Sequence, residues 1–160
     1  MSMTDALPSK GGVAYAKLVN VETPTIDDLK LMVLLEAAGQ GLYGGLADAA
    51  PNEAAKALLE RNGREELAHA HRVSRVIEHL WGERVPVPAP EDNPLYERPQ
   101  ITALSRDELE GLMQAEMGGE ALYDTWARNL KDDVAAKLLR QNGVEETRHG
   151  ERMKEVLALL

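Results

Sequence analysis

The stretch LLERNGREELAH, residues 58–69, returns eighty residues later as LLRQNGVEETRH, residues 138–149. Each copy contains the pattern Glu-x-x-His, formed by Glu66 with His69 and by Glu146 with His149. Residues three apart in a helix share a face, so the carboxylate and the imidazole of each pair can point into one site. The spacing therefore predicts two helices that each carry an acid and a histidine on the inward face.

The similarity extends well beyond this stretch. Compared without gaps, residues 25–80 and 105–160 share 18 identical residues among 56 pairs. One identical pair is Glu36 with Glu116, on the segments that precede the two Glu-x-x-His motifs. An internal repeat of this size predicts two halves with the same structure, each a hairpin of two helices that contributes half of a site.

Apolar residues recur at steps of three and four along four segments, which predicts helices near residues 25–49, 52–81, 105–130 and 132–159. Five of the eight prolines fall within residues 82–100, so this segment must be a long non-helical crossover between the hairpins. We therefore expect an all-α four-helix bundle over residues 25–160. Residues 1–24 show no clear periodicity, and we expect a mostly irregular N-terminal arm there with a short ordered piece around residues 13–19.

Composition narrows the chemistry of the chain. Its 160 residues suffice for one domain with a substantial core. The absence of cysteine excludes disulfides, thiolate zinc sites and cysteine-ligated iron–sulfur clusters. A formal charge of −9 argues against nucleic-acid binding, and no run of 18 apolar residues predicts a membrane span. The first twenty residues lack the apolar core of a signal peptide, so we expect a cytoplasmic protein.

Six side chains of ligand type lie on the inward faces of the predicted helices: Glu36, Glu66, His69, Glu116, Glu146 and His149. Four buried carboxylates without compensation would be prohibitive, whereas two divalent cations supply four positive charges. Mixed carboxylate and imidazole ligands suit iron or manganese, and zinc can occupy the same ligands. Each histidine, with the Glu of the preceding helix, would hold one metal, and the Glu of the two Glu-x-x-His motifs would lie between the metals. Without metal the cluster must take up protons, so we expect its carboxylate pKa values to rise.

Six further residues lie close to these candidates in the pattern: Gln40, Tyr43, Asn62, Glu120, Tyr123 and Asn142. The two tyrosines can hydrogen-bond a ligand, carry electrons or simply fill the core. The two asparagines can act as hydrogen-bond donors behind the ligands or join neighbouring helices. Glu120, whose repeat mate is Gln40, is a candidate for a seventh ligand or a proton carrier.

One Glu from each of two helices and one Glu-x-x-His from each of the other two resemble the ferritin-like di-iron and di-manganese carboxylate bundles. The resemblance covers residues 25–160 and includes the single long crossover. Within that superfamily the chain is most similar to the rubrerythrin branch, although it lacks the four-cysteine rubredoxin module of many members. Rubrerythrins also carry an extra Glu three residues after the first ligand of the third helix, where this chain has Gly119.

The resemblance implies two iron ions that react with hydrogen peroxide or dioxygen, and hence a peroxidase or ferroxidase served by an electron donor that the sequence does not name. It also implies a homodimer, because relatives commonly dimerise. A di-iron hydroxylase of the demethoxyubiquinone-hydroxylase type and a non-enzymatic iron-binding or storage protein are the alternatives. Metal bound only for stability, and acids and histidines that simply face solvent, also fit the pattern.

Overall fold

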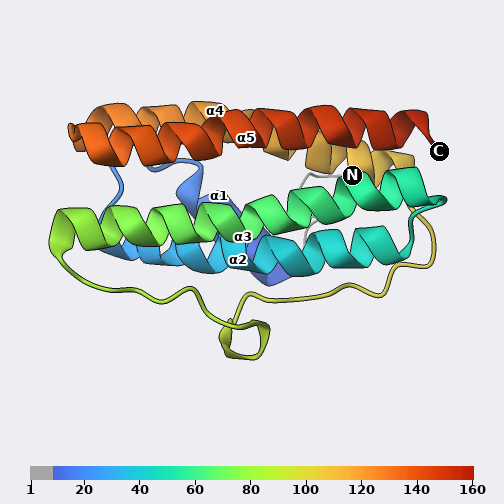
Figure 1. Cartoon of the computed structure of the whole chain (residues 1–160), viewed down its shortest axis with the longest axis horizontal. Helices are drawn as coiled ribbons and strands as arrows, with labels where there is room; N and C mark the ends of the chain where they lie inside the picture. The colour runs from blue at the N-terminus through green and yellow to red at the C-terminus, as the bar shows by residue number, and fades with distance from the viewer. Residues whose placement is uncertain (1–8) are drawn as a thin grey trace.

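The computed structural model describes residues 9–160, and all the regular elements in that range are helical. Two helix pairs form the bundle: α2 (Ile26–Asp48) packs along α3 (Glu53–Trp81), and α4 (Arg106–Leu130) packs along α5 (Asp133–Ala158) (Figure 1). A short helix, α1 (Ser9–Leu18), precedes them, and a 3-10 turn, η1 (Pro90–Asp92), lies in the long connection. The predicted all-α bundle with one long crossover is confirmed.

The sequence at each helix start explains where the long helices begin. Thr25 caps α2, because its hydroxyl accepts a hydrogen bond from the Asp28 N–H at 3.2 Å while Asp28 Oδ2 accepts from the Thr25 N–H at 2.9 Å. The side chains of three further residues cap the other long helices: Asn52, Ser105 and Asp132. Gly82 ends α3 in the left-handed conformation, with φ of 70°. These caps satisfy backbone groups that helix ends would otherwise leave without partners.

The core consists of two apolar clusters separated by a polar centre. Leu29, Val73, Trp126 and Leu139 belong to one cluster. Members of the other cluster include Leu46, Leu59, Leu109 and Val156. Along every long helix the two clusters occupy opposite ends, so the middle turns are left for the polar residues. Among residues 9–160, α3 packs directly against α5, whereas α2 and α4 make no close backbone contact with each other.

The ordered piece of the N-terminal arm is longer than the expected residues 13–19. Residues 1–8 lie outside the described part of the chain, but Ser9–Leu18 form α1. Gly11 and Gly12 weaken the helical propensity of this segment. Packing outweighs that preference, because Ala14 and Leu18 are buried and α1 lies against α2.

The crossover between α3 and α4, which we call the strap, follows the length of the bundle (Figure 1). Asn93 Nδ2 donates to the backbone oxygen of Leu34 at 2.9 Å. Gly45 lets the strap approach α2 closely, since a Cβ there would lie 2.6 Å from the backbone oxygen of Pro99. These contacts hold the connection against the outer face of α2.

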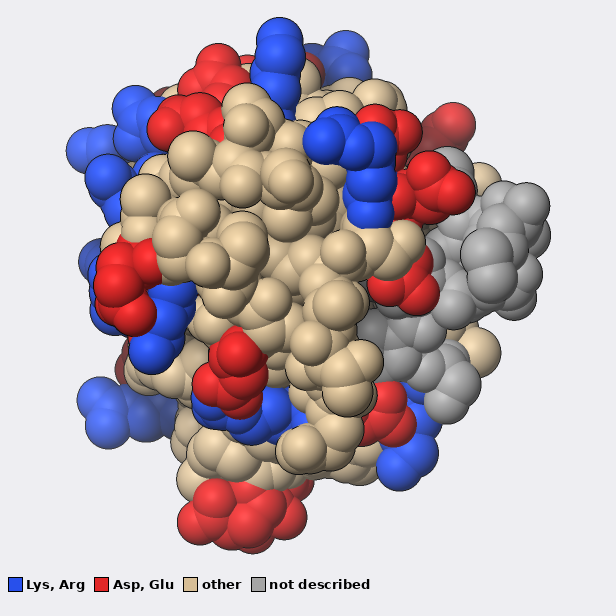
Figure 2. Space-filling model, turned by 90° about the vertical axis from the view of Figure 1, so that its right-hand side faces the viewer, with Lys and Arg blue, Asp and Glu red and all other residues tan. Residues whose placement is uncertain are grey.

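One end of the bundle, where α2 turns into α3 and where α5 ends, shows a largely uncharged centre with charged side chains around it (Figure 2). The C-terminal Leu159 and Leu160 are among the exposed large apolar residues. No helix within residues 9–160 has the length and apolar character needed to cross a membrane.

Candidate metal centre

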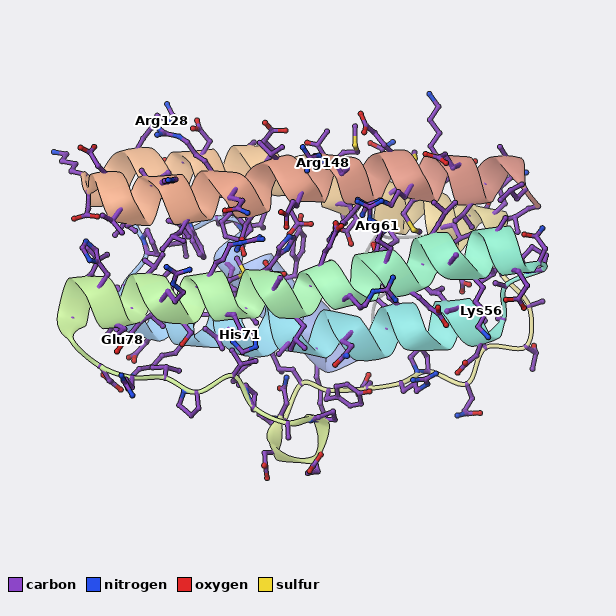
Figure 3. The ribbon with its side chains drawn as sticks, viewed as in Figure 1. Lys56, Arg61, His71, Glu78, Arg128 and Arg148 are labelled. Atoms are coloured by element: carbon purple, nitrogen blue, oxygen red, sulfur yellow. The ribbon has the colours of Figure 1, made fainter. Side chains whose placement is uncertain are left out.

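The polar centre of the bundle contains all six residues that the sequence proposes as ligands, and side chains of both helix pairs fill the space between α3 and α5 (Figure 3). One ligand atom from each of four residues, Glu66, His69, Glu146 and His149, lies within 4.8 Å of the others. The remaining two carboxylates complete the group, with Glu36 Oε2 at 3.5 Å from His69 Nδ1 and Glu116 Oε2 at 3.5 Å from His149 Nδ1. The side chain of Glu116 is 10 % exposed, and the other five are buried more deeply.

The two imidazole rings stack against each other at the interface of α3 and α5, with centroids 5.0 Å apart and planes 15° from parallel. His69 Nδ1 lies 3.2 Å from Glu146 Oε1, and His149 Nδ1 lies 3.1 Å from Glu66 Oε1. Both Nδ1 atoms are buried, and neither has a hydrogen-bond partner of acceptable geometry. Each therefore presents a nitrogen to the carboxylates without bonding to them, as a metal ligand does.

The opposite nitrogen of each ring is held by a carboxylate from the other helix pair. His69 Nε2 lies 3.0 Å from Glu145 Oε2, and Arg72 binds the same carboxylate through hydrogen bonds of 2.7 and 3.1 Å. The equivalent set at an offset of eighty residues consists of His149, Glu65 and Arg152. A carboxylate at Nε2 fixes the ring orientation and the tautomer, which leaves the Nδ1 lone pair for a metal.

Sequence reasoning did not find this arrangement of outer carboxylates and arginines. The sequence predicts Glu66 as a ligand, and the structure points Glu66 into the cluster, whereas the adjacent Glu65 lies on the outer side of His149. The pattern did contain a signal. Both pairs, Glu65 with Glu145 and Arg72 with Arg152, are identical between the two repeats although none of the four belongs to the apolar face.

Both tyrosines bond to carboxylates of the opposite helix pair. The Tyr43 hydroxyl donates to Glu116 Oε1 at 2.7 Å, and the Tyr123 hydroxyl donates to Glu36 Oε1. Burial, followed by the nearby carboxylates, raises the pKa of each tyrosine well above its ordinary value. Both hydroxyls therefore remain protonated donors at neutral pH, and each tyrosine hydrogen-bonds a candidate ligand while its ring lies in the core.

The asparagines join the two helix pairs behind the imidazoles. Asn62 Nδ2 donates to the backbone oxygen of His149 at 3.3 Å, and Asn142 Nδ2 donates to that of His69 at 3.2 Å. Arg152 in turn donates to Asn62 Oδ1 at 2.9 Å. They contact the histidine backbones and not the candidate ligand atoms, so they fix the positions of α3 and α5.

The structure does not bring Glu120 and Gln40 into the cluster. Glu120 is exposed and accepts a hydrogen bond from the Thr147 hydroxyl. Gln40 lines a separate surface pocket with Glu60 and Arg64, between α2 and α3. Neither position supports a seventh ligand.

Two glycines make room for the central carboxylates. A Cβ placed on Gly119 would lie 2.7 Å from Glu146 Cγ, and one on Gly39 would lie 2.9 Å from Glu66 Cγ. Both distances are far below van der Waals contact. Absence of a side chain at these positions therefore allows Glu66 and Glu146 to reach the centre.

Protons balance the charge of the metal-free cluster. Burial, and then the neighbouring carboxylates, raises the pKa of Glu66 well above its ordinary value and that of Glu116 to about 7. Burial disfavours the charged forms of the two histidines, but the surrounding carboxylates outweigh it and raise both pKa values, that of His149 to about 12.

The expected rise of the carboxylate pKa values is therefore right for Glu66 and Glu116 and wrong for the other two. Burial raises the pKa of Glu36 and Glu146, but the adjacent imidazolium groups and protonated neighbours, Tyr123 beside Glu36 and Glu116 beside Glu146, lower both below the ordinary value. Two ionised carboxylates then face two imidazolium groups, and protons neutralise the remaining acids. Two divalent cations can replace those protons, and oxygen and nitrogen donors of this kind suit iron, manganese or zinc.

Comparison with known proteins agrees with this geometry. The family model described as Rubrerythrin matches residues 29–157, a range that runs from α2 to the last turn of α5 and includes all six clustered residues. Comparisons with curated proteins and with solved structures found no match. The matched range covers most of the chain, and no rubredoxin module is indicated in it. The chain therefore belongs to the rubrerythrin family of ferritin-like di-iron proteins.

Proposed function

We propose that this protein is a di-iron oxidoreductase that reduces hydrogen peroxide, with the two irons held by Glu36, Glu66, His69, Glu116, Glu146 and His149. The observation that carries the proposal is the pair of buried Nδ1 atoms, which lack hydrogen-bond partners and lie among four carboxylates. A merely structural cluster of acids and histidines would be expected to satisfy such atoms, because an unsatisfied buried polar atom costs about 1–3 kcal/mol.

The distances favour Glu66 and Glu146 as the ligands shared between two metals. Glu146 places one oxygen 3.2 Å from His69 Nδ1 and the other 3.5 Å from His149 Nδ1. The oxygens of Glu66 lie 3.1 Å from His149 Nδ1 and 4.0 Å from His69 Nδ1. Glu36 and Glu116 each approach a single histidine, which suits ligands that hold one metal each.

The protein supplies orientation, charge and protons to this centre. When bound, two iron(II) ions would supply the two electrons that reduce hydrogen peroxide, with two protons, to two molecules of water. Glu65 and Glu145 orient the imidazoles. The Tyr43 hydroxyl oxygen lies 2.7 Å from Glu116 Oε1 and donates a hydrogen bond to it. An external one-electron donor must restore the centre, since the chain has no cysteine-based redox group of its own.

Gly119 distinguishes this centre from the rubrerythrin pattern. A Glu at this position has no room, because even a Cβ would collide with Glu146. The nearby Glu120 points to the surface and bonds to Thr147. We therefore propose a six-ligand centre that works without the additional Glu.

Anaerobic loading with iron(II), followed by separate additions of oxygen and of hydrogen peroxide, tests the proposal. We expect two irons per chain. Absorption spectroscopy should show that hydrogen peroxide oxidises the bound iron(II) faster than oxygen does. Metal analysis of the purified protein comes first, because manganese or zinc would change the interpretation.

A matched pair of variants on α3 tests the ligand assignment. Glu66→Ala should lose paired binding, whereas His71→Ala should keep it, because His71 is exposed on the same helix (Figure 3). If Glu66→Ala still binds two irons with unchanged reactivity, the assignment of Glu66 as a ligand is wrong.

A further inference from the structure

A cavity between α2 and α4 leads to the metal centre. Its lining includes the carboxylates of Glu36, Glu66, Glu116 and Glu146. The cavity volume is about 120 Å³. An engineered apolar cavity of roughly 150 Å³ is known to hold benzene, so a small organic molecule is of the right size. Hydrogen peroxide, with two heavy atoms, needs far less space.

The walls of this cavity are aliphatic. They come from equivalent positions of α2 and α4, eighty residues apart: Met32 with Leu112, Leu35 with Ala115, and Leu42 with Leu122. The helix α1 and the crossover add Tyr15 and Leu95. Small residues such as Ala38 and Ala115 keep the space open although larger apolar side chains would fill it.

The charged groups in the lining favour an uncharged ligand over an ion. Within the described part of the chain, no Lys, Arg or His lines the cavity, so a bound anion would have no partner among its walls. With the four central carboxylates neutralised by two metals, the half-buried Glu97 is the one acidic group left in the lining. An uncharged molecule would enter at the lowest desolvation cost.

We propose that this cavity binds a neutral aliphatic molecule beside the metal pair, as the organic ligand of the centre. The inference rests on the proposed function in one respect only, namely that two metals neutralise the inner end of the cavity. The cavity walls select the aliphatic body by burial of apolar surface. Tyr15, on α1, lines the cavity outside the cluster and offers a neutral hydroxyl donor for an oxygen of the ligand.

Isothermal titration of the anaerobic iron(II)-loaded protein with 1-octanol tests this proposal. We expect saturable binding of one 1-octanol per chain. Octanoate should bind more weakly by at least about tenfold, because the four carboxylates already balance the charge of the two metals and Glu97 adds a negative charge to the lining. Ala115→Leu narrows the cavity from α4 and should weaken binding by at least about tenfold. Ala121→Leu is the matched control, since Ala121 is an exposed residue of the same helix and should leave binding unchanged.

Ala38→Leu, which narrows the cavity from α2, decides the outcome if Ala115→Leu fails to retain two irons. Absence of saturable binding to the unmodified protein would overturn the proposal. So would tighter binding of octanoate than of 1-octanol, or unchanged binding in a folded cavity-filling variant. Peroxide consumption is measured in the same samples. Binding of 1-octanol without peroxide consumption would refute the proposed function alone. Peroxide consumption without binding of 1-octanol would refute the cavity assignment alone.

Discussion

Replacement of Gly119 by alanine should damage the metal centre without removing any candidate ligand. The added methyl group would lie 2.7 Å from Glu146 Cγ and 2.9 Å from Glu146 Cβ. Because Glu146 Cβ is attached directly to the backbone of α5, rotation of the side chain cannot relieve both contacts. Either α4 and α5 must move apart or the Glu146 carboxylate must leave its position.

Two effects of opposite sign set the expected magnitude. Alanine is favoured over glycine in a helix interior by about 1 kcal/mol. Overpacking of a well-filled site costs about 1–3 kcal/mol, and contact with a backbone-anchored atom places this case near the upper end. We therefore expect the metal-free Gly119→Ala protein to lose about 1–2 kcal/mol of unfolding free energy. Iron affinity should fall about 10–100-fold, the loss typical when the support of a ligand is disturbed.

Gly111→Ala is the matched control, because it lies on the same helix and a Cβ there meets nothing within 4 Å. It should gain about 0.5–1 kcal/mol through helical propensity alone. Urea unfolding followed by circular dichroism measures the stability of both variants, and competition titration with a chelator measures iron affinity. Equal stabilisation of the two variants, with equal iron affinity, would refute the argument that Gly119 makes room for Glu146.

Three other predictions follow from the same centre. Glu65→Gln should keep two bound irons but weaken them about 10–100-fold in a competition titration, because His149 Nε2 loses its anionic partner. Tyr43→Phe should cost about 1–3 kcal/mol in urea unfolding, since Glu116 Oε1 loses its donor. The metal-free protein should have a lower melting temperature at pH 8 than at pH 5. The folded protein holds a proton on Glu116 up to a pKa of about 7 and on His149 up to about 12, whereas the ordinary values are 4.5 and 6.5, so its stability falls as pH rises through both windows. A melting temperature that rises between these pH values would contradict the charge balance of the cluster.

The bundle and the six central residues could be anticipated from the sequence because both depend on periodicity. Glu66 and His69 follow the apolar face of α3, and the same pattern eighty residues later places Glu146 and His149 on α5. Helical geometry then leaves little choice about which side chains meet in the interior.

Contacts that cross between helices were not accessible in this way. The pairing of Glu145 with His69, and the close approach of Gly119 to Glu146, depend on the distance and rotation between α3, α4 and α5. The extent of α1 was not predictable for a related reason, because its two glycines disfavour helix and its stability comes from Ala14 and Leu18 packing on the bundle.

The side-chain hydrogen bonds around the centre join the two helix pairs. Residues of α2 and α3 bond to residues of α4 and α5 in six such bonds: Tyr43 to Glu116, Tyr123 to Glu36, His69 to Glu145, His149 to Glu65, Asn62 to the backbone of His149 and Asn142 to the backbone of His69. A buried polar network stabilises a protein only if its members are satisfied. Among buried side-chain atoms in residues 9–160, the two imidazole Nδ1 atoms are the exceptions, and both face the carboxylates. Ligation of two metals by three residues from each helix pair would satisfy these atoms and add further links across the same interface, so the binding of metal and the association of the two halves should stabilise each other.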